Sequence, residues 1–209
     1  MDIRSLGSTG FEVKCSAGTI LIDPDPKQIS GTFTDSNTVI VFTITKDEKA
    51  PKSKAASQVI VGPGEYEIGG VSIRGVGTPA DDPATSHKIN TVYVIDGDGI
   101  AVCALGALGS SPDSLATQQI GKVNILLIDP DKSLMGADDL AGIVRTLEPD
   151  VIAPSGYDVT NNRPGKSMKS LLTELGVKSV EAISKYSTTL SALPEQRTTV
   201  ILSPKNEPV

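Results

Sequence analysis

Residues able to perform acid–base or metal chemistry are few in this chain. It contains one histidine, His87, and two cysteines, Cys15 and Cys103. A zinc site needs three or four imidazole, thiolate or carboxylate ligands, and both cysteines lie in apolar, strand-like runs. The residues themselves therefore argue against a zinc enzyme.

His87 lies in a polar segment rich in proline and aspartate, which favours a solvated loop histidine. The alternative is a general base near a pocket, oriented by Asp81 or Asp82. A serine nucleophile would also have to use His87, and the chain has no Gly-x-Ser-x-Gly elbow. We therefore assign no catalytic residue.

Carboxylates offer a weaker candidate site. Asp47 and Glu48 could hold a hard cation together with Asp23, Thr43 and Thr45, because Mg²⁺ and Ca²⁺ accept carboxylate and hydroxyl oxygens. Two adjacent acids in a lysine-rich loop are more often solvated surface, so we assign no metal.

Two strand ends and a glycine-rich segment also carry polar groups. Asp23 precedes Pro24, which favours a structural acid that accepts backbone hydrogen bonds in the next turn. The pair Asp129 and Asp131 also ends a strand, where polar groups normally face solvent. Segment 106–111 could cradle an anion, but it lacks the lysine and threonine of a phosphate loop, which favours a plain turn.

The pattern of apolar residues predicts the elements that position these groups. Helices are expected at 114–120, 137–147 and 167–175, a hairpin at 66–73 and a loop at 75–88. Strands are expected at 11–15, 19–22, 39–42, 59–61, 91–95, 100–105, 125–128, 151–153 and 198–202.

The order of these elements contains a repeat. Strand, turn, strand and buried strand occur at 11–42 and again at 91–128, which indicates two related halves. We expect a single α/β domain over residues 1–209, with helices stacked on sheets in a layered sandwich.

Composition limits partners and compartment. The net charge of −6 and pI of about 4.8 argue against nucleic acid. No apolar run approaches the roughly 20 residues that cross a membrane, and residues 1–4 do not open a signal peptide. We expect a cytoplasmic protein in which Cys15 and Cys103 are buried and reduced.

Several short runs resemble the metallo-β-lactamase superfamily, in particular its small bacterial metal-dependent hydrolases and lactonase-like proteins. They are Leu6-Gly7-Ser8, Ile20-Leu21-Ile22-Asp23-Pro24, Gly62-Pro63-Gly64-Glu65-Tyr66-Glu67, Leu105-Gly106, and Pro154 with Tyr157. The resemblance covers nearly the whole chain and implies an αββα layered sandwich.

The resemblance also implies where zinc ligands should stand, and this chain departs from that pattern. Enzymes of the superfamily carry H-x-H-x-D-H after a buried strand, and only one of its four ligand positions keeps its family residue here. The vestigial metal-site positions are Ser8, Thr43, Thr45, Asp47, Glu48, Ala104, Ala107 and Gly156. Because each follows or ends a buried strand, we expect them to converge at one end of the two sheets.

Two functions remain open from the sequence. The first is a non-catalytic binding or scaffold protein without a cofactor, whose partner is a protein, a small molecule or a second copy of the chain. The second is a metal-dependent hydrolase with a site rebuilt on Asp47 and Glu48. The scarcity of ligands favours the first.

Overall fold

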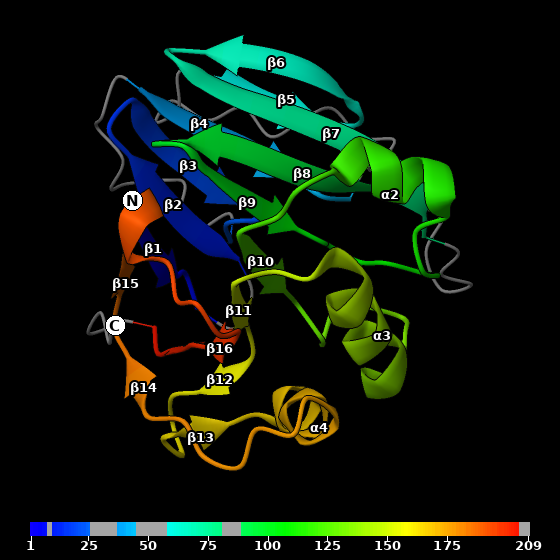
Figure 1. Cartoon of the computed structure of the whole chain (residues 1–209), viewed down its shortest axis with the longest axis vertical. Coiled ribbons are helices and arrows are strands. Elements are labelled where there is room, and N and C mark those ends of the chain that lie inside the picture. The colour runs from blue at the N-terminus through cyan, green and yellow to red at the C-terminus, as the bar shows by residue number, and fades with distance from the viewer. Residues whose placement is uncertain (8–9, 26–36, 45–57, 81–88, 205–209) are drawn as a thin grey trace.

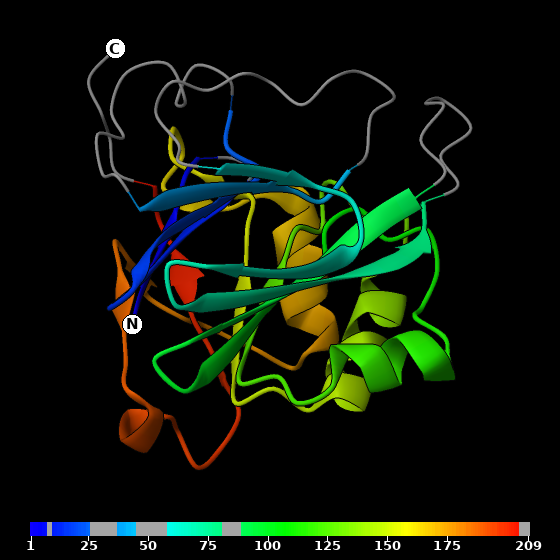
Figure 2. The same cartoon turned by 90° about the horizontal axis from the view of Figure 1, so that it is seen from above.

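The described part of the chain forms two stacked β-sheets, and its three α-helices lie on the side of the second sheet (Figures 1 and 2). The computed structural model describes residues 1–7, 10–25, 37–44, 58–80 and 89–204. Both sheets are mixed, and the described helices are few, as expected for the layered α/β sandwich.

The first sheet has six strands. Their order is β15 (Tyr186–Ser187), β1 (Asp2–Ser5), β2 (Phe11–Cys15), β3 (Gly18–Ile22), β4 (Thr38–Phe42) and β5 (Gln58–Val61). The second sheet has seven: β16 (Thr198–Thr199), β11 (Val151–Pro154), β10 (Ile125–Ile128), β9 (Ile100–Ala104), β8 (Ile89–Gly97), β7 (Val71–Pro79) and β6 (Gly64–Ile68).

Smaller elements complete the described chain. The strand β12 (Tyr157–Asp158) pairs with β13 (Arg163–Pro164), and β14 (Ala182–Ile183) pairs with β17 (Ile201–Leu202). The helices are α2 (Ser114–Ile120), α3 (Ala137–Leu147), α4 (Lys166–Glu174) and the 3₁₀ turn η1 (Leu190–Ala192). Among the residues that the structure describes, no helix is long and apolar enough to span a membrane.

The repeat expected from the sequence is present in the strand pairing. In the first sheet β2 pairs antiparallel with β3, and β3 pairs parallel with β4. In the second sheet β8 pairs antiparallel with β9, and β9 pairs parallel with β10. The two halves therefore have the same local topology.

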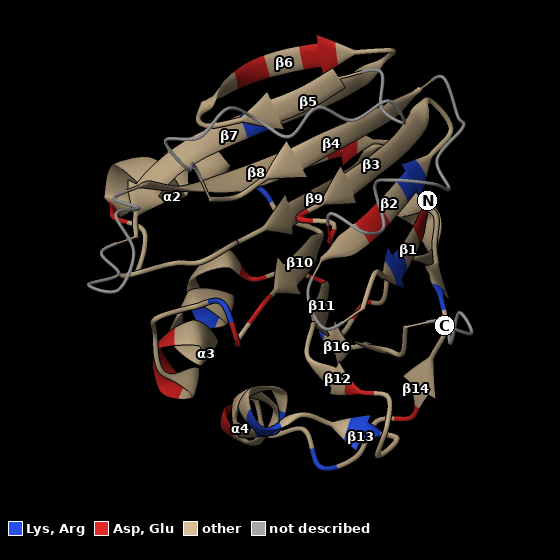
Figure 3. Cartoon of the chain, turned by 180° about the vertical axis from the view of Figure 1, so that it is seen from behind, with Lys and Arg blue, Asp and Glu red and all other residues tan. Residues whose placement is uncertain are grey.

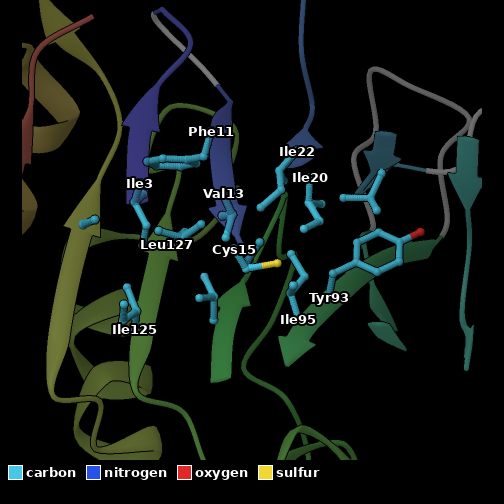
Figure 4. Packing of buried hydrophobic residues seen from close by; sticks show 14 of the residues in the cluster. Ile3, Phe11, Val13, Cys15, Ile20, Ile22, Tyr93, Ile95, Ile125 and Leu127 are labelled. Atoms are coloured by element: carbon cyan, nitrogen blue, oxygen red, sulfur yellow. The ribbon is translucent and has the colours of Figure 1, made fainter. Parts of the chain in front are cut away.

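The main core lies between the two sheets. Alternating side chains of the first sheet, such as Val13 and Ile20, face Ile95 and Leu127 of the second (Figure 4). Tyr93 is fully buried here, and its hydroxyl donates a hydrogen bond to the carbonyl oxygen of Gly62 at 3.1 Å. Apart from Phe11 and Tyr93 this core is mostly aliphatic, in keeping with the 3% aromatic content of the sequence.

A second core lies between the second sheet and the helices. The apolar face of α3, with Leu140, Ile143 and Val144, packs with Leu126 and Ile152 from β10 and β11. The helix matches the expected span of 137–147 because its apolar residues recur at helical spacing. It ends at Leu147, and the cap residue Glu148 has a φ of 46°.

Two expectations about strands were wrong. Residues 75–79, expected in a loop, continue β7 and pair with β8. A Cβ on Gly75 would lie 2.9 Å from Thr91 Cγ2, so only glycine permits this close approach. Because glycine has no side chain, it contributes nothing to the alternating pattern by which a strand is predicted. The expected strand 198–202 is two short strands, because β16 pairs with β11 whereas β17 pairs with β14.

Both cysteines are buried, whereas an outer strand of the second sheet carries exposed acids. Cys15 and Cys103 are free and buried, as expected, in the two different cores. In contrast, β6 is an outer strand of the second sheet, and its Glu65 and Glu67 side chains are exposed. The acidic positions of this strand are red in Figure 3.

Candidate functional site

The candidate site lies where the carboxyl ends of parallel strands from both sheets meet. Asp23 and Thr43 follow the parallel pair β3 and β4, while Ala104 and Asp129 stand at the ends of the parallel pair β9 and β10. They line one small cavity. Its full lining is Gly10, Phe11, Ile22, Asp23, Thr43, Ala104, Gly106, Leu127 and Asp129.

The cavity has room for about one water molecule. Its volume is about 10 Å³, and a water needs roughly 10–15 Å³. Thr43 narrows it from the first sheet and Gly106 from the second: a Cβ on Gly106 would lie 2.5 Å from Thr43 Cβ. Gly106 also has a φ of +66°, which glycine adopts without strain.

Asp23 joins the ends of β3 and β4. Its Oδ1 accepts a hydrogen bond from Thr43 N at 2.8 Å, and its Oδ2 accepts one from Thr43 Oγ1 at 2.5 Å. Asp23 therefore has the structural role expected of it as a hydrogen-bond acceptor. Its donor is Thr43 after the neighbouring strand β4, and not the turn that follows Asp23.

Lys132 connects this acid to the second sheet. Its ammonium Nζ lies 3.2 Å from Asp23 Oδ2 and 3.8 Å from Asp129 Oδ2. The exposed fractions of the side chains are 22% for Lys132, 12% for Asp23 and 7% for Asp129. One positive charge is thus shared by two largely buried carboxylates.

The expectation that Asp129 faces solvent was wrong. It follows the interior strand β10 and lines the cavity together with residues of the first sheet, while Asp131 is exposed. Asp129 Oδ1 accepts hydrogen bonds from Asp131 N at 3.2 Å and Lys132 N at 3.1 Å. Burial raises the pKa of the Asp129 carboxyl, and the Lys132 charge opposes that rise.

Two buried oxygens at this place have no hydrogen bond in the described part of the chain. They are Asp129 Oδ2, which faces the Lys132 ammonium, and Ser155 Oγ, which follows β11. Ser155 lies near enough to Asp129 to lower the pKa of its carboxyl. The charge on Lys132 therefore carries most of the compensation at Oδ2.

Asn90 holds the loop that follows β9. It is fully buried, and its Nδ2 donates to Leu105 O at 2.8 Å and to Thr78 Oγ1 at 3.0 Å. Its Oδ1 accepts from Ala107 N at 2.8 Å. Since Asn90 takes the Ala107 amide, that amide is not free for an anion, in line with the plain turn expected here.

The sequence profile of the β-lactamase superfamily domain matches residues 2–155. The chain belongs to the metallo-β-lactamase superfamily. No curated protein matches this chain significantly.

Solved structures show the same fold. A proposed Zn-dependent hydrolase of the metallo-β-lactamase superfamily from Thermotoga maritima is 23% identical, with 98% of this chain and 99% of that chain covered and a TM-score of 0.71. A proposed metal-dependent hydrolase from Parabacteroides distasonis is 15% identical over 83% and 87%, with a TM-score of 0.60. The metallo-β-lactamase fold protein YhfI from Bacillus subtilis is 9% identical over 97% and 96%, with a TM-score of 0.58.

The structure brings together some of the positions at which the superfamily resemblance implies ligands. Thr43 and Ala104 line the cavity, and Ala107 is buried one residue beyond the lining Gly106. Gly156 does not line it: a Cβ there would lie 2.8 Å from Asp131 Oδ2. The other four positions, Ser8, Thr45, Asp47 and Glu48, lie outside the described residues, as do His87, Asp81 and Asp82.

The donors that the structure describes at this cavity do not form a zinc site. In the described ranges, no three histidine, cysteine or acidic side chains gather closely enough to hold a metal. The two acids at the cavity, Asp23 and Asp129, share an ammonium that repels cations.

The sequence had not singled out Lys132 or Asn90. The one available signal was the Asp-Pro pair that ends an apolar strand in each half, Asp23-Pro24 and Asp129-Pro130. It marks the two carboxylates but says nothing about the lysine that joins them.

Proposed function

We propose that this chain is a member of the metallo-β-lactamase superfamily that has lost the metal site and acts as a non-catalytic binding or scaffold protein. The observation that carries the proposal is the cavity at the strand ends, which is lined by Thr43, Ala104 and Gly106 and holds about 10 Å³. Both its size and its chemistry support this function.

Size argues against a substrate at this place. Small-molecule sites usually enclose about 300–1,000 Å³. Here the Thr43 side chain and the Gly106 backbone approach each other closely and narrow the cavity. Enlarging the cavity would require the loop held by Asn90 to move away from Thr43.

Chemistry argues against water activation. A hydrolase lowers the pKa of a water with a metal or removes its proton with a free base. Both carboxylate oxygens of Asp23 accept hydrogen bonds from Thr43, and Asp23 and Asp129 share the Lys132 ammonium. Neither acid is a free base.

Two exposed apolar side chains support a binding surface on the loops after the strands of the second sheet. Ile89 and Leu134 are each 48% exposed. Ile89 pairs with Pro79, whose carbonyl accepts from Gly109 N at 3.0 Å, and Leu134 N donates to Leu108 O at 3.0 Å. We therefore place the contact with a protein, small-molecule or second-copy partner on the loops at this end of the second sheet.

We also propose a cytoplasmic location. Cys15 and Cys103 are free thiols in two separate cores, and free thiols are typical of reducing compartments. No zinc or other cofactor is part of the proposal.

The test combines metal content with turnover. The purified, dialysed chain should contain no stoichiometric zinc by elemental analysis. It should not turn over lactones, β-lactams or phosphoesters when zinc or manganese is added. Near-equimolar zinc that survives dialysis, or turnover that depends on metal, would overturn the proposal.

The same assay separates the alternative hydrolase. Turnover that is abolished by Asp47→Ala and Glu48→Ala would establish a rebuilt carboxylate site. Asp138→Ala is the matched control, because Asp138 is an exposed acid in the first turn of α3. Loss of turnover in that control would indicate damage unrelated to a site.

A further inference from the structure

The feature that calls for explanation is an ammonium group at the place where two acids from different sheets meet. Lys132 Nζ lies 3.2 Å from Asp23 Oδ2 and 3.8 Å from Asp129 Oδ2. Nearly buried carboxylates are costly unless an opposite charge and hydrogen bonds compensate them. The question is what supplies this compensation.

Hydrogen bonds satisfy three of the four carboxylate oxygens. Thr43 donates to both oxygens of Asp23, and two backbone amides donate to Asp129 Oδ1. The fourth oxygen, Asp129 Oδ2, has no hydrogen bond in the described chain and faces Lys132. The ammonium is therefore the cationic group that serves both acids.

The backbone around Lys132 is held in place. Its own amide donates to Asp129 Oδ1, so the residue contacts both oxygens of that carboxylate. The next residue, Ser133, donates from its amide to Asp129 O at 3.1 Å and from its hydroxyl to Leu108 O at 3.2 Å. The lysine thus stands on a turn fixed against the loop that follows β9.

We propose that Lys132 is a built-in cation: its ammonium takes the place of a metal ion between Asp23 and Asp129 and excludes divalent cations from them. The inference deepens the proposed function, since it rests on the loss of the metal site. A Ca²⁺ ion would need carboxylate oxygens at about 2.3–2.6 Å. An ammonium 3.2 Å from Asp23 Oδ2 occupies that space and repels a second cation.

The test replaces Lys132 with methionine, which keeps much of the side-chain length and removes the charge. In EDTA, Lys132→Met should lower the thermal midpoint by about 4–8 °C because it leaves two acids without their shared cation. Lys132→Arg should retain most of the midpoint. Lys185→Met is the matched control: it removes an ion pair to Asp2, at 3.0 Å, in which the lysine is more exposed.

Two rescues separate charge from packing. Millimolar Mn²⁺ should raise the thermal midpoint of Lys132→Met. It should not alter the thermal midpoint of the protein without substitutions. Adding Asp129→Asn to Lys132→Met should also restore part of the loss, because it removes one uncompensated charge. If Lys132 stabilises the protein only through packing, neither rescue should raise the thermal midpoint.

The proposal is overturned if Lys132→Met loses no more than Lys185→Met, or if both rescues leave the loss in place. Mn²⁺ bound stoichiometrically by the unchanged protein at Asp23 and Asp129 also overturns it. Metal-dependent turnover that survives Asp23→Asn would instead refute the proposed function alone. The stability of the Lys132 variants would then still report on the built-in cation.

Discussion

Replacing Asn90 with aspartate changes a buried amide into an acid of nearly the same shape. Asn90 is fully buried and uses its Nδ2 as a donor to both Leu105 O and Thr78 Oγ1. An ionised aspartate can donate to neither. A protonated aspartate can donate to one of them, at a net loss of about 1 kcal/mol.

The larger loss of stability comes from keeping the buried aspartate protonated. An unfolded aspartate has a pKa of about 3.9, so keeping the acid neutral at pH 7 costs about 4 kcal/mol. Because the pKa of the introduced acid is raised in the folded state, stability is retained below about pH 4 and lost as the pH rises. We expect a loss of about 5 kcal/mol at pH 7 and about 1–2 kcal/mol at pH 4.

The assay is urea unfolding of variant and unchanged protein at several pH values between 4 and 7. The control is Asn162→Asp, since Asn162 serves as an acceptor for the Tyr157 hydroxyl at 2.9 Å and an aspartate keeps that bond. An equal loss at pH 4 and pH 7, or a loss no larger than that of the control, would refute the hydrogen-bond assignment at Asn90.

Three further outcomes follow from the structure. Gly106→Ala should lose about 2–4 kcal/mol in urea unfolding, and more than Gly176→Ala. Both glycines have positive φ, but a Cβ at Gly176 meets nothing within 4 Å; equal losses would contradict crowding at Gly106. A thiol reagent should label Cys15 and Cys103 only at the rate of opening, because both are buried and burial raises the pKa of Cys103 to about 12; rapid labelling of the native protein would contradict this. Since burial raises the pKa of Asp129, Asp129→Asn should gain stability relative to the unchanged protein as the pH rises from about 4 to 7; denaturant unfolding that shows the opposite slope would contradict the burial.

Local sequence patterns were enough to predict the helices and strands whose bounds depend on their own residues. Helix α3 was predicted to the residue because its apolar positions recur at helical spacing and its end adjoins Pro149. Strand β2 alternates, and a clear turn separates it from the apolar run of β3. By contrast, β7 beyond Gly75 depends on its pairing with β8, and a glycine carries no side-chain pattern.

The site was predictable only in outline. The family resemblance singled out Thr43 and Ala104 at strand ends, and both line one cavity. The burial of Asp129 could not be inferred, since it depends on residues of the first sheet that line the same cavity. The position of Lys132 between two acids depends on contacts across the sheets that no spacing along the chain encodes.

The exposed glutamates of β6 bear on how this molecule meets other copies of itself. An outer strand offers backbone donors and acceptors on which another strand can add, and charged side chains discourage this. Two copies joined antiparallel through β6 would bring Glu65 and Glu67 close to the same residues of the other copy, where like charges repel. The charges on this strand therefore oppose growth of the second sheet by strand addition at β6.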